Sequence, residues 1–93
     1  MPRRLEQLEA EVERAASKLR AARRAEEATD AAHRAAKARR QEDPSAWSRA
    51  EEDACADLCA TSLRFLQDAT RELARAQDRL ASARDRAREE VPA

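Results

Sequence analysis

Apolar positions recur along this chain at alternating spacings of three and four residues, in two long tracts. The first tract carries Leu5, Leu8, Val12, Ala15, Leu19 and Ala22, and its spacing continues through Glu26, Thr29, His33 and Ala36. The second tract carries Cys55, Cys59, Ser62, Leu66, Ala69, Leu73, Ala76, Leu80, Ala83 and Ala87. A heptad repeat of this kind predicts two helices that pack against each other along a seam.

A short segment around Pro44 separates the two tracts. The residue before a proline is disfavoured in the α region, so the first helix should end near Glu42. Asp43 or Ser45 can cap the second helix, and Pro44 suits a first helical turn. We therefore predict a single domain, residues 1–93, with helix one at about 3–42, a turn at 43–46, helix two at about 45–89 and a frayed tail at 90–93.

Folding back at Pro44 would pair residues whose numbers sum to about 88. Leu8 then faces Leu80, and each of the next layers sets one larger side chain against alanine: Val12 with Ala76, Ala15 with Leu73, Leu19 with Ala69, and Ala22 with Leu66. Large residues facing small ones allow close helix packing. The predicted fold is all-α, an antiparallel two-helix hairpin with a coiled-coil-like, alanine-rich seam.

Residues 54–66 are apolar on more sides than one partner helix can cover. Leu58 and Phe65 lie about a quarter turn from the seam, and Leu63 lies on another side. A helix that is apolar most of the way round is surrounded, which favours dimerisation into a four-helix bundle or docking of a partner helix. We expect a non-enzymatic interaction module, a homodimer or the binder of another protein, whose contact residues are Trp47, Leu58, Leu63, Phe65 and Leu66.

The composition supports a helical protein and limits the partners and the compartment that we expect for it. The chain has no glycine and five β-branched residues, which disfavours strands and excludes a glycine-rich phosphate loop. The net charge is zero, so no overall attraction to nucleic acid or anionic membrane is expected. No run reaches the roughly 18 to 20 apolar residues of a membrane span. We expect a cytoplasmic protein with its cysteines reduced, and seventeen arginines against two lysines suggest a bacterial source.

Charged runs flank the predicted seam. Arg34, Lys37, Arg39 and Arg40 lie opposite Glu51, Glu52, Asp53 and Asp57, and Glu6, Glu9, Glu11 and Glu13 lie opposite Arg75, Arg79 and Arg84. Such pairs set register more than stability. The basic residues without an obvious acidic counterpart are Lys18, Arg20, Arg23 and Arg24. They leave a nucleic-acid-associated regulator as a weaker alternative, although no aromatic residues lie among them to stack on bases.

One cluster carries candidate chemistry. Cys55 and Cys59 lie one helical turn apart on a face that looks towards His33, and the antiparallel register sets Cys55 across from His33 and Cys59 across from Thr29. Two thiolates and an imidazole can bind zinc or Cu(I), with Asp30, Glu26 or water completing the shell. The alternative function is therefore a thiol-based metal or redox sensor. The competing interpretation is that both cysteines are small buried hydrophobes.

A helical hairpin of this length with Trp47 beside the bend resembles the WXG100 family of secreted bacterial proteins. The resemblance implies dimerisation into four-helix bundles and export from the cell. The family's Trp-x-Gly turn would fall at Trp47-Ser48-Arg49, where arginine replaces glycine, and the chain has no tyrosine for the family's C-terminal export signal.

Overall fold

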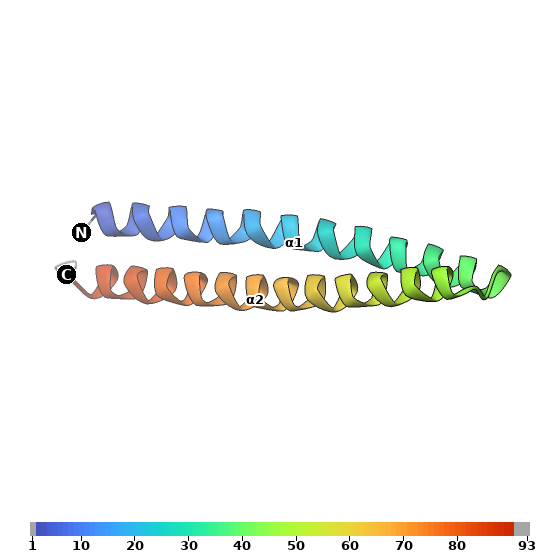
Figure 1. Cartoon of the computed structure of the whole chain (residues 1–93). Coiled ribbons are helices and arrows are strands. Elements are labelled where there is room, and N and C mark those ends of the chain that lie inside the picture. The colour runs from blue at the N-terminus through green and yellow to red at the C-terminus, as the bar shows by residue number, and fades with distance from the viewer. Residues whose placement is uncertain (1, 91–93) are drawn as a thin grey trace. The chain divides into compact units, whose positions relative to one another are not determined.

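A computed structural model describes residues 2–90, and it confirms the predicted all-α hairpin (Figure 1). Helix α1 runs from Pro2 to Glu42 and helix α2 from Ala46 to Glu90, where the sequence predicted about 3–42 and 45–89. No strand occurs within residues 2–90. Of the predicted frayed tail, Glu90 belongs to α2 and residues 91–93 lie outside the described part of the chain.

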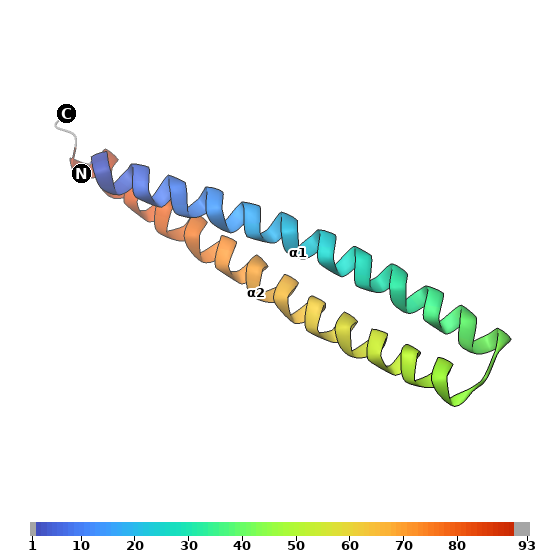
Figure 2. The same cartoon turned by 45° about the horizontal axis from the view of Figure 1, so that its top comes forward.

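Residues 43–45 connect the helices, and α2 begins directly after Ser45 (Figure 2). The Ser48 backbone N–H donates to Ser45 Oγ at 3.2 Å, which is the bond of a helix N-cap. The buried Ser48 hydroxyl donates to the carbonyl oxygens of Asp43 and Ser45. Pro44 therefore precedes the cap rather than occupying the first helical turn, because Ser45 supplies the capping oxygen.

The contacts between the helices group the chain into two compact units. Unit 1 comprises Met1–Arg20 and Asp68–Ala93, and unit 2 comprises Ala21–Gln67. Each unit contains a segment of α1 and an antiparallel segment of α2, so each has its own seam. The two seams share one heptad spacing and differ in chemistry.

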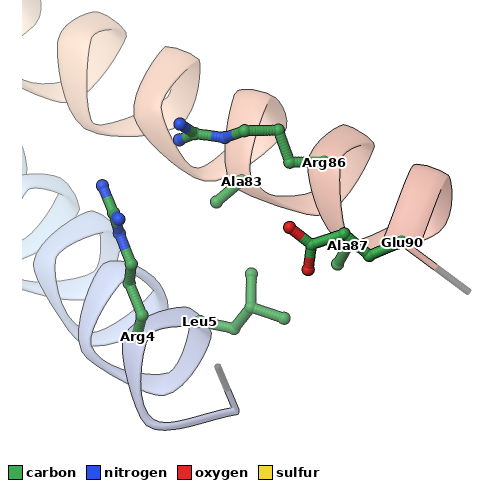
Figure 3. Close-up of a pocket in the computed structure, with 6 residues that line it drawn as sticks. All are labelled: Arg4, Leu5, Ala83, Arg86, Ala87 and Glu90. Atoms are coloured by element: carbon green, nitrogen blue, oxygen red, sulfur yellow. The ribbon is translucent and has the colours of Figure 1, made fainter.

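The seam of unit 1 is apolar. Leu8, Leu80 and Ala83 form its buried cluster, and Leu5 and Val12 pack against this cluster. The other buried positions of the seam are Ala15, Leu19, Ala69 and Ala76. Figure 3 shows the end of this seam, where Leu5 points toward Ala83 and Ala87 between the charged side chains of Arg4, Arg86 and Glu90. The leucines and alanines predicted to form this seam are buried or half-buried, and alanine allows the backbones to approach closely.

The seam of unit 2 is polar at most of its layers. Ala36 and Ser48 are its buried residues, and the half-buried positions include Glu26, Thr29 and His33 on α1 and Cys55, Cys59 and Ser62 on α2. The Cys59 thiol donates to the Thr29 carbonyl oxygen at 3.1 Å, which confirms the predicted register at that layer. Because polar groups contribute little on burial, this seam holds its helices together less strongly than an all-apolar one would.

Candidate protein-interaction surface

Unit 2 turns its large apolar side chains outward. The exposed fractions are 80% for Trp47, 65% for Phe65, 56% for Leu58 and 47% for Leu63. All four belong to the predicted contact set. The fifth member, Leu66, is half-buried on the seam between the helices. The contact set is therefore divided, with Leu66 serving the hairpin itself and the other four facing away from the seam.

Ion pairs identify the flank of the seam on which Leu58 and Phe65 lie. In unit 1, Lys18 pairs with Glu72 at 3.2 Å and Arg79 pairs with Glu11 at 3.6 Å. In unit 2, Arg39 pairs with Glu51. On α1 these residues belong to the sevenfold series 11, 18, 25, 32, 39, and on α2 to the series 51, 58, 65, 72, 79. The remaining members of the two series are Ala25, Ala32, Leu58 and Phe65, so apolar residues occupy heptad positions that elsewhere carry charge.

An apolar face follows from this placement. On α1 the face consists of exposed alanines at helical spacing: Ala21, Ala25, Ala28, Ala32 and Ala35. On α2 it consists of Trp47, Ala54, Leu58, Thr61 and Phe65. We call these ten residues the apolar face, and none of them carries a charge. All ten lie within unit 2, on the side of its seam that Arg39 and Glu51 mark.

The opposite flank of unit 2 is charged on α1. Arg23, Asp30 and Lys37 recur there at intervals of seven residues, and Asp30 pairs with Arg34 at 3.2 Å. Leu63 is exposed at the corresponding position of α2. Leu63 therefore lies on the other side of the hairpin from Phe65, and the predicted contact set does not form one surface. The structure also adds the alanines of α1, whose only signal in the sequence is their uninterrupted helical spacing.

Two ion pairs lie next to the bend of unit 2. Arg39 bonds Glu51, and Arg40 bonds Glu52, whose side chain is 14% exposed. Both pairs join the basic and acidic runs predicted to face each other. The hydrogen bond from Arg40 holds the pKa of Glu52 below its usual value against the opposing effect of burial, and the charges of Arg40, His33 and Lys37 lower this pKa further. The same bond raises the pKa of Arg40.

The Arg40–Glu52 pair should make stability depend on pH. Because the pKa of Glu52 is lowered in the folded state, its contribution is present above the unfolded pKa of about 4.3 and is lost as the pH falls through the folded value. Glu52→Gln should lower the melting temperature at pH 7, and its difference from the wild type should shrink below pH 4. Circular dichroism melts between pH 7 and pH 2.5 would show this. Glu27→Gln, at an exposed position of α1, is the control, and a pH-independent difference for Glu52→Gln would contradict the assignment.

The predicted metal cluster is not assembled in the structure. Across residues 2–90, no three His, Cys, Asp or Glu side chains are grouped so as to hold a metal ion. Cys55 and Cys59 are free and half-buried, and the thiol of Cys59 is engaged by the Thr29 carbonyl. Asp30, expected to complete the shell, pairs with Arg34 instead. The antiparallel register brings Cys59 to Thr29, and no group containing His33, Cys55 and Cys59 forms.

The prediction that the basic cluster lacks acidic partners was wrong for one residue. Lys18 pairs with Glu72, which lies across the seam of unit 1. Arg20, Arg23 and Arg24 are exposed.

Within residues 2–90, neither helix has an apolar stretch of the length that a membrane crossing requires. No protein-family model, curated protein or solved structure matches the chain.

Proposed function

We propose that this protein is a non-enzymatic interaction module that docks a helical surface on the apolar face of unit 2. The observation that carries this proposal is the inverted polarity of that unit. Its seam contains Glu26, His33 and Ser62, while Phe65 and Leu58 face outward. A helical segment normally buries its apolar stripe and exposes its polar one.

Docking of a helix would remove from water the apolar side chains that unit 2 exposes. Fully covering a leucine or phenylalanine side chain contributes about 1.5–3 kcal/mol each. Leu58 and Phe65, which are 56% and 65% exposed, can therefore supply part of the roughly 8 kcal/mol of a micromolar complex. The alanines of α1 allow an incoming helix to approach closely along that side. The mechanism is completion of a helical bundle. We place this activity in the cytoplasm of a bacterial cell, where the free thiols of Cys55 and Cys59 would persist.

The proposal is tested with charged substitutions on and off the face. Leu58→Lys combined with Phe65→Lys should abolish association, because two lysines would have to be desolvated where two apolar groups were buried. The expected loss of affinity is at least about a hundredfold. Association is measured both as self-association by sedimentation velocity and as co-purification of partner chains from extracts of the cells that express the protein.

The matched control is Ala60→Lys combined with Gln67→Lys. Both residues are exposed on α2 within unit 2 and lie off the apolar face. The control should associate as the wild type does, and circular dichroism should show equal helicity for both variants. Equal behaviour of the two variants, or a wild type that neither self-associates nor retains a partner, would refute the proposed function.

A further inference from the structure

We infer that the occupant of the apolar face is a second copy of this chain, placed by a two-fold axis that runs perpendicular to the helices through Ala28 and Thr61. This inference rests on the proposed function and names its partner. In the resulting dimer, α1 packs antiparallel on α1 of the second copy, and α2 packs antiparallel on α2. The bends of the two hairpins then point in opposite directions.

The alanine series of α1 has the symmetry that such an axis demands. A perpendicular two-fold axis exchanges residues that lie equally far on either side of it along a helix. About Ala28, Ala21 exchanges with Ala35, seven residues to either side, and Ala28 meets its own copy. Ala25 lies three residues before the centre and meets Ala31 and Ala32 of the second copy, which lie three and four residues after it. Every layer of the α1–α1 contact is then alanine against alanine. This composition allows the two helices to approach closely with no charge buried.

The outward residues of α2 show the same symmetry about Thr61. Leu58 and Phe65 lie on either side of this residue, so each Phe65 would meet Leu58 of the second copy. Asp57 and Arg64 are exposed and border the face, seven residues apart, and the Arg64 guanidinium donates to the Thr61 hydroxyl at 3.5 Å within the same helix. The axis sets each Asp57 beside Arg64 of the second copy, which forms two complementary contacts across the interface.

The antiparallel register within unit 2 places the two centres of symmetry, Ala28 on α1 and Thr61 on α2, at the same level along the helices. Two contacts define which residues of α1 and α2 lie across from each other. They are the hydrogen bond from the Cys59 thiol to the Thr29 carbonyl and the ion pair between Arg39 and Glu51. By that register, Ala28 lies at the level of Thr61. One axis therefore satisfies both helices, whereas two unrelated centres would require two different dimers.

Charge selects this axis over the other two-fold arrangement. An axis parallel to the helices would place α1 over α2 of the second copy, with Phe65 above Ala25. That arrangement would set Arg24 beside Arg64 of the second copy at both rims, because the two arginines lie at the same level. Like charges in such positions oppose association. The perpendicular axis pairs Arg64 with Asp57 instead, and it brings Arg24 near Ala31.

Cysteine cross-linking locates the axis directly. In a Cys55→Ser, Cys59→Ser background, Ala28→Cys should form a disulfide-linked dimer under mild oxidant, because the two copies of residue 28 meet on the axis. Arg23→Cys, on the opposite flank, should give little cross-linked product under the same conditions. Efficient cross-linking at Arg23 instead of Ala28, or equal cross-linking at both positions, would overturn the geometry.

A charge exchange at the rim tests symmetry by a second route. Asp57→Arg should weaken the dimer roughly tenfold, because it sets two arginines together at each rim. Adding Arg64→Asp should restore the wild-type affinity in sedimentation equilibrium. A double variant as weak as the single one would overturn the two-fold pairing.

A third outcome separates this inference from the proposed function. A wild-type chain that stays monomeric at millimolar concentration, yet loses a captured partner on Leu58→Lys/Phe65→Lys substitution, would refute the homodimer. The role of the apolar face would survive that result.

Discussion

Glu26→Leu combined with Ser62→Ala should raise the free energy of unfolding by roughly 1.5–3 kcal/mol. Glu26 and Ser62 are half-buried at one layer of the unit 2 seam, by the register that brings Cys59 to Thr29. The double variant would recreate the buried pattern of Leu19 and Ala69 in unit 1. The gain comes from burying a leucine where a carboxylate is now partly desolvated, and alanine also favours the helix over serine.

Chemical denaturation followed by circular dichroism measures this gain. Hydrogen exchange should place the added protection in residues 21–67, because the substituted layer lies within unit 2. Glu27→Leu is the matched control, since Glu27 is exposed beside Glu26 and its replacement should change stability by less than about 0.5 kcal/mol. A gain no larger than that of the control would show that the polar seam is not the weaker one.

Leu80→Ala should destabilise the protein by roughly 2–4 kcal/mol. Leu80 is buried with Leu8 and Ala83, and Leu5 and Val12 pack against this cluster. Because a small helical hairpin has a net stability of only several kcal/mol, this loss would leave much of the chain unfolded at 37 °C. Thermal melts and urea titrations would report a lower midpoint.

Two controls separate lost packing from a loss of leucine in general. Leu80→Met keeps the buried volume and should cost less than about 1.5 kcal/mol. Leu63→Ala removes an exposed leucine and should cost less than about 1 kcal/mol. A cost for Leu63→Ala equal to that for Leu80→Ala would mean that the cluster around Leu80 is not what holds unit 1 together.

The sequence predicted the α2 part of the apolar face and not the α1 part. The composition of residues 54–66 identified an excess of apolar side chains on α2, and Phe65 and Leu58 are exposed as expected. The alanines of α1 were missed because alanine suits any helical position and carries little signal alone. Leu63 was expected on another side of α2 than Leu58 and Phe65, yet it was included with them in one contact set.

The candidate metal site shows a different limit. Register correctly brought Cys59 to Thr29 across the seam. Ligation requires side chains to converge within a few ångströms, whereas register specifies only the level along the helices. Asp30 illustrates the difference, because it turns to Arg34 on its own helix and not toward the cysteines.

By itself, the sequence determined the hairpin, its bend and its seams. Heptad spacing defines which stripe of each helix is covered, and Pro44 with Ser45 ends one helix and caps the next. These are local properties, so they can be read residue by residue.

Only the tertiary structure decided which polar side chains meet. Register brings several charged side chains within reach of one another, and the rotamers that they adopt select the partner. Across the seams, Arg39 pairs with Glu51 in unit 2 and Lys18 pairs with Glu72 in unit 1. In unit 2, the Cys59 thiol bonds the Thr29 carbonyl oxygen and Asp30 pairs with Arg34 on its own helix, so within residues 2–90 these groups form no metal-binding cluster.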